Sequence, residues 1–208
     1  MGSGRTYGGV AGTERAAERR AQLLEAGLDL LGAPDGPGEV TVRGVCRAAG
    51  LTARYFYESF ADRDALMVAV YDHVVAELGA EMLAAVEASP HAAAPRTRAG
   101  LAVLVRSIAE DPRRGRLLFS RSVGASPVVA ARRAESTRWF VDLMAAQVRE
   151  FYRIERTPRV DVAAELLVGG VAQILTSWLD GVLLLTADEL VDHCAELFLA
   201  VAGERTGA

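Results

Sequence analysis

The sequence predicts an all-α protein of about nine helices, and two observations carry that prediction. Apolar residues make up 51% of the 208 residues and recur three and four positions apart along most of the chain, which is the spacing of amphipathic helices. Pairs of a capping residue followed by proline mark three helix starts, because proline suits the first helical position. These pairs are Asp111-Pro112, Ser126-Pro127 and Thr157-Pro158. No segment has a convincing strand pattern.

Residues 41–60 predict two short helices joined by a tight turn. Thr41 can cap the first helix through its hydroxyl, Gly50 stands where a helix ends in the left-handed conformation, and Thr52 can cap the second helix. The apolar positions expected to face inward are Val42, Val45, Cys46, Ala49, Phe56 and Phe60. The side chains expected to face outward on the second helix are Ala53, Arg54, Tyr55 and Tyr57. Together these features predict a helix-turn-helix.

The charge of this stretch differs from that of the whole chain. The formal net charge is −4, yet the charged residues within residues 41–57 are Arg43, Arg47 and Arg54. A local cluster of cations on an acidic protein favours contact with DNA phosphates, and a guanidinium flanked by phenols suits a major groove. The alternative is a solvated charged face.

The block from Thr41 to Leu66 resembles the DNA-binding signature of the TetR (tetracycline-repressor) family of bacterial transcription regulators. The matching residues are Thr41-Val42-Arg43, Ala48-Ala49-Gly50-Leu51-Thr52, Phe56-Tyr57, Phe60 and Arg63-Asp64-Ala65-Leu66. The match covers about the first third of the chain. Two positions depart from the family pattern: Glu58 stands where His or another neutral or basic residue is common, and Arg54 stands where Gly is common.

The resemblance implies a homodimeric regulator of the bacterial cytoplasm, associated with the nucleoid. Such a protein binds an inverted-repeat operator in double-stranded DNA, represses transcription by default and is released by a small molecule. The residues expected to contact DNA are Thr41, Arg43, Thr52, Ala53, Arg54, Tyr55, Tyr57 and Arg63. Arg54 and Tyr55 are expected to set the base preference. The residues expected to hold the DNA backbone are Arg43, Thr52, Tyr57 and Arg63.

The chain is expected to divide into three parts. Residues 1–12 are rich in glycine and predict a flexible arm, in which Arg5 either reaches DNA or belongs to a disordered tail. Residues 13–61 form the helix-turn-helix domain, whose first helix begins at Thr13, and residues 62–208 form a helical effector-binding and dimerisation domain. The core expected for the first domain is Leu24, Leu28, Val45, Ala49, Phe56 and Phe60.

The middle of the chain is expected to enclose a small-molecule pocket. Helices are predicted from Asp62 to Ala88, from Arg96 to Glu110, from Pro112 to Phe119 and from Pro127 to Arg153. The candidate lining residues are Leu101, Val105, Phe119, Trp139, Leu143, Gln147 and Trp178. Each of them also fits plain core, which is the commoner role of such residues. A pocket of this composition would suit a largely apolar effector.

The C-terminal part predicts a surface that needs a partner. The chain is almost entirely apolar from Val160 to Leu185, and a helix apolar on most sides must be covered on most sides. A membrane span is one explanation, and a second subunit is the explanation we favour, because acidic residues and Gly169-Gly170 interrupt the stretch. A capping box, Thr186 to Glu189, starts the last helix. The expected dimer interface is Leu166, Gly169, Gly170, Gln173, Ile174, Leu190, Cys194, Leu197 and Phe198.

Other chemistries have little support in the sequence. Cys46 and Cys194 lie among apolar neighbours and predict buried thiols. The three histidines have no metal-ligand spacing, and no nucleophile elbow or phosphate-binding loop is present. We therefore expect no cofactor, no metal and no enzymatic activity. A helical ligand-binding or scaffold protein without DNA binding is the competing class.

Overall fold

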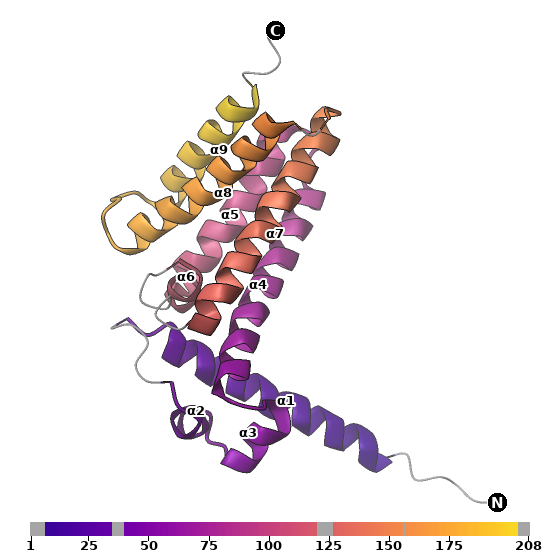
Figure 1. Cartoon of the computed structure of the whole chain (residues 1–208), viewed down its shortest axis with the longest axis vertical. Coiled ribbons are helices and arrows are strands. Elements are labelled where there is room, and N and C mark those ends of the chain that lie inside the picture. Colours follow the sequence, from indigo (N-terminus) through magenta and orange to yellow (C-terminus); the bar gives the residue numbers. More distant parts are fainter. Residues whose placement is uncertain (1–6, 35–39, 120–126, 156, 204–208) are drawn as a thin grey trace, which may run out of the picture.

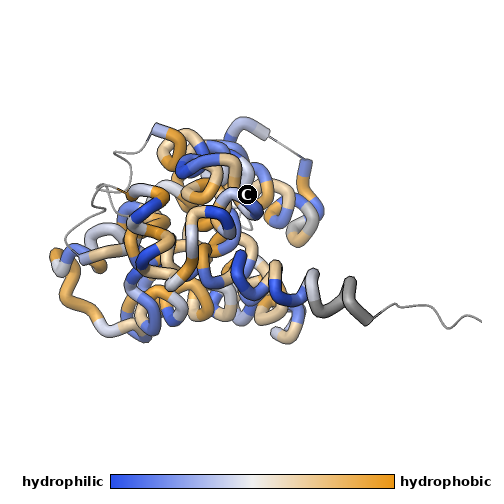
Figure 2. Tube along the Cα trace, turned by 90° about the horizontal axis from the view of Figure 1, so that it is seen from below, coloured by the Kyte–Doolittle hydropathy of each residue, from blue (hydrophilic) through white to orange (hydrophobic). Residues whose placement is uncertain are grey.

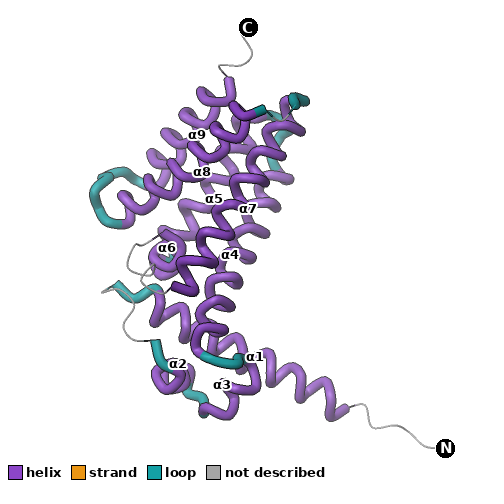
Figure 3. The backbone as a smooth tube through the Cα atoms, in the orientation of Figure 1, coloured by secondary structure: helices purple, strands orange, loops and turns teal. Residues whose placement is uncertain are grey.

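The computed structural model describes residues 7–34, 40–119, 127–155 and 157–203, and within these ranges the secondary structure is helical (Figures 1 and 3). The helices are α1 (Tyr7–Leu31), α2 (Val42–Ala49), α3 (Ala53–Ser59), α4 (Arg63–Ala88), α5 (Ala93–Glu110), α6 (Pro112–Phe119), α7 (Pro127–Tyr152), α8 (Pro158–Leu179) and α9 (Ala187–Gly203). The predicted all-α class is confirmed.

Local capping explains several of the helix starts. The hydroxyl of Thr41 accepts a hydrogen bond from the Gly44 amide at 3.0 Å, and the Asp62 carboxylate accepts one from Ala65 at 2.8 Å. At the start of α9 the predicted capping box is present, because Thr186 N donates to the Glu189 carboxylate at 2.8 Å and Glu189 N donates back to the Thr186 hydroxyl at 3.3 Å. Each of these bonds satisfies an amide that the helix itself cannot pair.

Two helix boundaries differ from the sequence prediction. The first helix begins at Tyr7 rather than Thr13, since extending an existing helix needs no new nucleation. Helix α5 begins at Ala93 rather than Arg96, and its first turn tolerates Pro95 because no amide hydrogen is needed there. Arg5 lies outside the described residues.

Helix α8 stops at Leu179 although the apolar stretch continues to Leu185. Gly181 takes a left-handed conformation, φ 69°, and turns the chain away. The indole nitrogen of Trp178 donates to the Leu185 carbonyl at 2.8 Å and fixes the far end of the turn. The apolar stretch is therefore longer than the helix, because hydropathy reports burial and not helix length.

A head formed by α1, α2 and α3 lies at one end of an elongated body (Figure 1). Helix α4 runs from the head into the body, where α5, α7, α8 and α9 lie alongside one another and α6 packs near the head. The N-terminal half of α1 projects beyond the head, and its described part is largely hydrophilic (Figure 2). The six predicted core residues of the head are all buried or packed against the core.

One hydrophobic core connects the head to the body. It runs from Leu24 and Phe56 in the head through Val70 on α4 to Val105 and Leu190 in the body without a break. The crossing of α1 and α4 is close, because a side-chain carbon built on Gly27 would lie 2.7 Å from Val70. The expected boundary at residues 61 and 62 thus divides the sequence but not the packing.

Candidate nucleic-acid interface

The turn between α2 and α3 is fixed from within. Gly50 ends α2 with φ 66°, and the Leu51 amide donates to the Cys46 carbonyl at 2.9 Å. Gly44 lets the Thr41 cap form, because a side-chain carbon there would lie 3.1 Å from the capping hydroxyl. Phe56, which is fully buried, holds α3 against the core. The outer face of α3 is therefore presented in one orientation.

The head carries exposed arginines on both helices of the motif. Arg43 and Arg47 on α2 are exposed, and the Arg54 side chain on α3 is 85% exposed. Ala53, at the start of α3, is exposed as well. Three of the predicted contact residues, Arg43, Ala53 and Arg54, therefore lie on accessible surface of the head, as does Arg47.

Two further predicted contact residues are available to a ligand. Thr52 occupies the N-cap position of α3, but its side chain makes no capping hydrogen bond and is exposed. Tyr57 is also exposed, and its ring packs edge-on against Phe56 with 5.4 Å between the centroids. The hydroxyl of Thr41, in contrast, is engaged as a cap and the residue is half-buried.

Tyr55 lies differently from the sequence expectation. The residue is half-buried, and the Arg19 guanidinium of α1 lies over its ring, 4.4 Å from the centroid. One face of this phenol is thus used to join α3 to α1 by a cation–π contact. The ring that was predicted to face outward is therefore covered on one face by Arg19 of α1.

Glu58, which departs from the family pattern, lies between two arginines. One carboxylate oxygen accepts a hydrogen bond from Nε of Arg54 at 3.2 Å, and the other lies 3.6 Å from Arg19 on α1. The Glu58 carboxylate is 42% exposed. It therefore lies between two guanidiniums from two helices, at the edge of the exposed face.

The N-terminus of α4 is less positive than expected. Arg63 is exposed, but its Nε donates to the Asp64 carboxylate at 3.1 Å. Asp62 already satisfies the Ala65 amide as the cap. Two carboxylates thus oppose the phosphate that Arg63 was predicted to hold.

A cluster of ion pairs joins the end of α1 to α6. Arg113 on α6 pairs with Glu25 at 2.7 Å and with Asp29, both on α1, and with Asp111 at 2.7 Å. The hydrogen bond from Arg113 lowers the pKa of the Asp111 carboxyl below its usual value, and these bonds raise the pKa of Arg113. This α1–α6 clasp connects the head to the body beside the shared core.

No family model and no curated protein sequence matches the chain. Solved structures do match, and 86 of their chains resemble this chain in fold. A transcriptional regulator from Pseudomonas aeruginosa PAO1 superposes with a TM-score of 0.73 at 22% identity, covering 92% of each chain. A TetR family transcription regulator from Marinobacter aquaeolei VT8 gives 0.68 at 18% identity, covering 91% of this chain and 97% of that one.

The chain has the TetR fold. FadR from Bacillus subtilis, solved in complex with stearoyl-CoA, shares it with a TM-score of 0.67 at 12% identity, covering 87% of this chain and 98% of that one. The resemblance that the sequence carried over its first third therefore extends, as a fold, over most of the chain.

The predicted pocket residues divide between the core and the surface of this TetR fold. Leu101 and Val105 are buried core residues, and Phe119 and Trp178 are partly buried against the same core. The three predicted residues of α7 are exposed, namely Trp139, Leu143 and Gln147. Helix α7 turns these three side chains outward, which periodicity alone could not establish.

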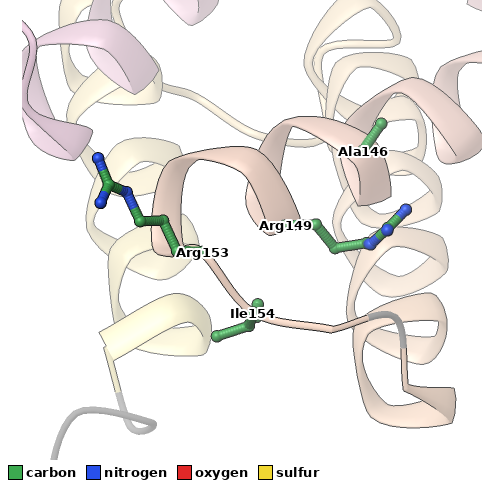
Figure 4. Close-up of a pocket in the computed structure, with 4 residues that line it drawn as sticks. All are labelled: Ala146, Arg149, Arg153 and Ile154. Carbon is green, nitrogen blue, oxygen red and sulfur yellow. The ribbon is translucent and has the colours of Figure 1, made fainter.

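An open hollow of about 400 Å³ lies instead near the C-terminal end of α7. Its lining residues are Ala146, Arg149, Arg153 and Ile154, and the two guanidiniums point in different directions (Figure 4). The left-handed conformation of Arg153, φ 49°, closes the helix, since Ile154 N donates to the Arg149 carbonyl at 3.1 Å. This hollow is a helix end rather than a converging anion site.

Polar side chains that the sequence analysis missed gather inside the body around the end of α6. Tyr71 on α4 is hydrogen-bonded to Ser136 on α7, and burial raises the pKa of the Tyr71 phenol. Arg133 on α7 donates to the Leu117 carbonyl at 2.7 Å, and burial lowers the pKa of its guanidinium. Thr176 on α8 donates to carbonyls of α6 and α8. The sequence signal that could have identified this cluster is the presence of polar residues at inward-facing positions of otherwise apolar helices.

The expected dimer residues separate into three sets by exposure. Leu166 is 61% exposed and Leu197 is 57% exposed, and Gly169 and Gln173 are exposed as well. Gly170, Ile174 and Phe198 are partly buried. Leu190, at 1% exposure, and Cys194 are buried in the core of the chain itself. These last two are therefore not available to a partner, because α9 packs against α5 on that side.

The outer face of α8 exposes the apolar side chains of Val162 and Leu166 beside Glu165 and Gln173. Among the described helices, α8 has the length and hydropathy that could cross a membrane, and 28% of its most apolar window is buried.

The described residues hold no group of three or more His, Cys, Asp or Glu side chains that could bind a metal ion. Cys46 and Cys194 are buried thiols, as predicted, and burial raises the pKa of both.

Proposed function

We propose that the protein is a transcription regulator that binds an inverted-repeat operator as a homodimer, represses transcription and is released by a small, largely apolar effector. The observation that carries the proposal is the exposed cationic face of α2 and α3. A guanidinium on the outer face of a helix-turn-helix can enter a major groove and read base edges. The competing class, a helical protein that binds no DNA, leaves this local positive charge on an acidic chain without a role.

The proposed contacts divide into two kinds. Arg54 is the base-reading residue, because it is the arginine of α3 and its side chain is 85% exposed. Arg43, Thr52 and Tyr57 hold the phosphate backbone, which fixes the register of α3 without reading sequence. Arg63 is a weaker candidate, since Asp64 lies beside it.

The first experiment is a gel shift of the purified protein on the promoter region next to its own gene, at low salt. We expect a specific shift that is competed by the same duplex and not by random DNA. Because two heads act together, the protected site should be an inverted repeat with centres about one helical turn apart or slightly more. A folded dimer that shifts no DNA at low salt would contradict the proposal.

Variants of the head separate the two kinds of contact. Arg54→Ala should lower the preference for the cognate site by roughly 1–3 kcal/mol. Thr52→Ala and Tyr57→Ala should instead weaken binding to cognate and random duplexes alike. Arg138→Ala, which removes an exposed arginine from α7 in the body, is the matched control. An equal loss on both duplexes for Arg54→Ala would refute its reading role.

The proposed dimer forms through the outer face of α8 and α9. Leu166 and Leu197 supply exposed apolar surface there, and Gly169 would let a facing helix approach closely, because nothing lies within 4 Å of a side-chain carbon built at that position. A partner subunit accounts for this exposed apolar surface of α8 more simply than a membrane, because α8 also packs on α6 and α7 of the same chain.

The proposed effector site is the body around the end of α6. A small-molecule site needs apolar walls and a few placed polar groups, and Leu101 and Val105 with the polar set of Tyr71, Ser136 and Thr176 supply these. A ligand that binds the DNA-incompetent state more tightly than the DNA-competent state would weaken DNA binding by this difference in affinity. A thermal-shift screen of apolar molecules should be extended to long-chain acyl-CoAs, which join an apolar chain to a charged group, because FadR from Bacillus subtilis was solved with stearoyl-CoA. A compound that raises the melting temperature should also release DNA.

A further inference from the structure

We propose that Glu58 is a specificity-determining residue of the DNA-reading head. It holds Arg54 in a base-reading orientation and keeps Arg19 away from DNA phosphates, so that it weakens binding to all DNA while improving discrimination. The inference rests on the proposed function.

The first step is the geometry of Arg54. Its Nε donates to Glu58 at 3.2 Å one helical turn away, while the side chain remains 85% exposed. Because the carboxylate takes Nε, the two terminal nitrogens are left for another acceptor. A guanidinium that presents its terminal nitrogens matches the O6 and N7 acceptors of guanine in the major groove. The class of base that Arg54 reads is therefore guanine.

The second step is the fixing of Arg19. Its guanidinium lies over the Tyr55 ring at 4.4 Å and within 3.6 Å of the Glu58 carboxylate. The Arg19 side chain is only 25% exposed although it lies on the hydrophilic side of α1. Tyr55 and Glu58 thus hold against α3 a cation that could otherwise extend to a phosphate.

The third step is the effect of the Glu58 charge itself. A carboxylate at the edge of the reading face repels phosphates whatever the sequence, so this charge lowers the affinity for operator and random DNA alike. Specificity is a difference of affinities, and the difference comes from Arg54, whose orientation favours the operator. An arginine that is already oriented also loses less rotamer freedom on binding. The exposed ion pair contributes little to folding, so its role is in recognition rather than stability.

The test compares Glu58→Gln with the wild type on the operator duplex and on a scrambled duplex of the same composition. Fluorescence anisotropy gives both dissociation constants across a series of KCl concentrations. We expect Glu58→Gln to bind the scrambled duplex roughly tenfold more tightly at low salt, with a smaller change on the operator, and its salt dependence to steepen by about one phosphate contact. Glu81→Gln removes the same charge from the exposed side of α4 and should change neither ratio nor slope.

Arg54→Ala tests the coupling. In that background Glu58→Gln should no longer lower the specificity ratio, because the residue it orients is gone. Thermal unfolding should be unchanged by Glu58→Gln. A wild type that binds its operator and a Glu58→Gln variant with the same specificity ratio would contradict this inference alone. A uniform loss on both duplexes with a lower melting temperature would show that Glu58 merely ties α3 to α1. A wild type that binds no duplex would contradict the proposed function as well.

Discussion

Gly50 and Gly79 form a matched pair that tests how the turn of the head is specified. Neither position has any atom within 4 Å of a side-chain carbon built on it, so steric crowding plays no part in either substitution. They differ in backbone conformation: Gly50 has φ 66° at the end of α2, whereas Gly79 lies inside α4. Replacement by alanine should therefore have opposite effects at the two sites.

The magnitudes follow from the backbone alone. Alanine at Gly50 must adopt the left-handed region, which costs roughly 1–2 kcal/mol. Alanine at Gly79 removes the conformational freedom of a glycine within a helix and should stabilise by roughly 0.5–1 kcal/mol. Because the head shares one core with the body, the cost at Gly50 should appear in the unfolding of the whole chain.

The assay is urea unfolding followed by circular dichroism, with all proteins at one concentration because a dimer makes stability concentration-dependent. In thermal unfolding of a chain of this size, a change of 1 kcal/mol in the free energy of unfolding corresponds to a shift in melting temperature of about 2–4 °C. Gly50→Asn should lose less than Gly50→Ala, since asparagine tolerates the left-handed region better. A Gly50→Ala variant as stable as the wild type, beside a stabilised Gly79→Ala variant, would refute the reasoning.

Three further substitutions test the interface, the head and the α1–α6 clasp. Leu166→Glu with Leu197→Glu should convert the dimer to a monomer in analytical ultracentrifugation, whereas Leu83→Glu, at an equally exposed leucine of α4, should leave the dimer intact; dissociation by all of them would point to misfolding. Phe56→Ala should lower the free energy of unfolding by about 3–5 kcal/mol, because it empties a fully buried site, and unaltered stability would contradict the packing described for α3. Pairing with Arg113 lowers the pKa of Asp111 in the folded protein, so its contribution is present above the unfolded carboxyl value of about 4 and is lost as the pH falls below it. Asp111→Asn should therefore reduce the steepness with which stability declines on acidification, and an unchanged slope between about pH 5 and pH 2 would count against the pair.

Features set within a few residues of the chain could be predicted from the sequence. The Thr41 cap, the Gly50 turn and the Thr186–Glu189 box each depend on atoms five residues apart or fewer. The head core was also predictable, because its apolar residues repeat at helical spacing and each short helix has one apolar side. The length of α8 was not, since Gly181 and not hydropathy ends it.

Features that depend on which neighbour a helix meets could not be predicted. Leu190 and Leu197 lie about two turns apart on one side of α9, yet the first is buried and the second is exposed. Nothing in the periodicity of α9 distinguishes them. The role of Glu58 was hidden for the same reason, because its second partner, Arg19, belongs to another helix.

The unbroken core has a consequence for attempts to use the head as a portable module. A fragment ending at residue 61 would separate Leu24 and Phe56 from the α4 residues Leu66, Met67 and Val70, which belong to the same buried core. Transfer of this head to another protein should therefore succeed only when the first turns of α4 are included. Including α6 should also help, because Arg113 on α6 forms an ion pair with Glu25 on α1. The unit that can be exchanged between proteins is thus larger than the helix-turn-helix alone.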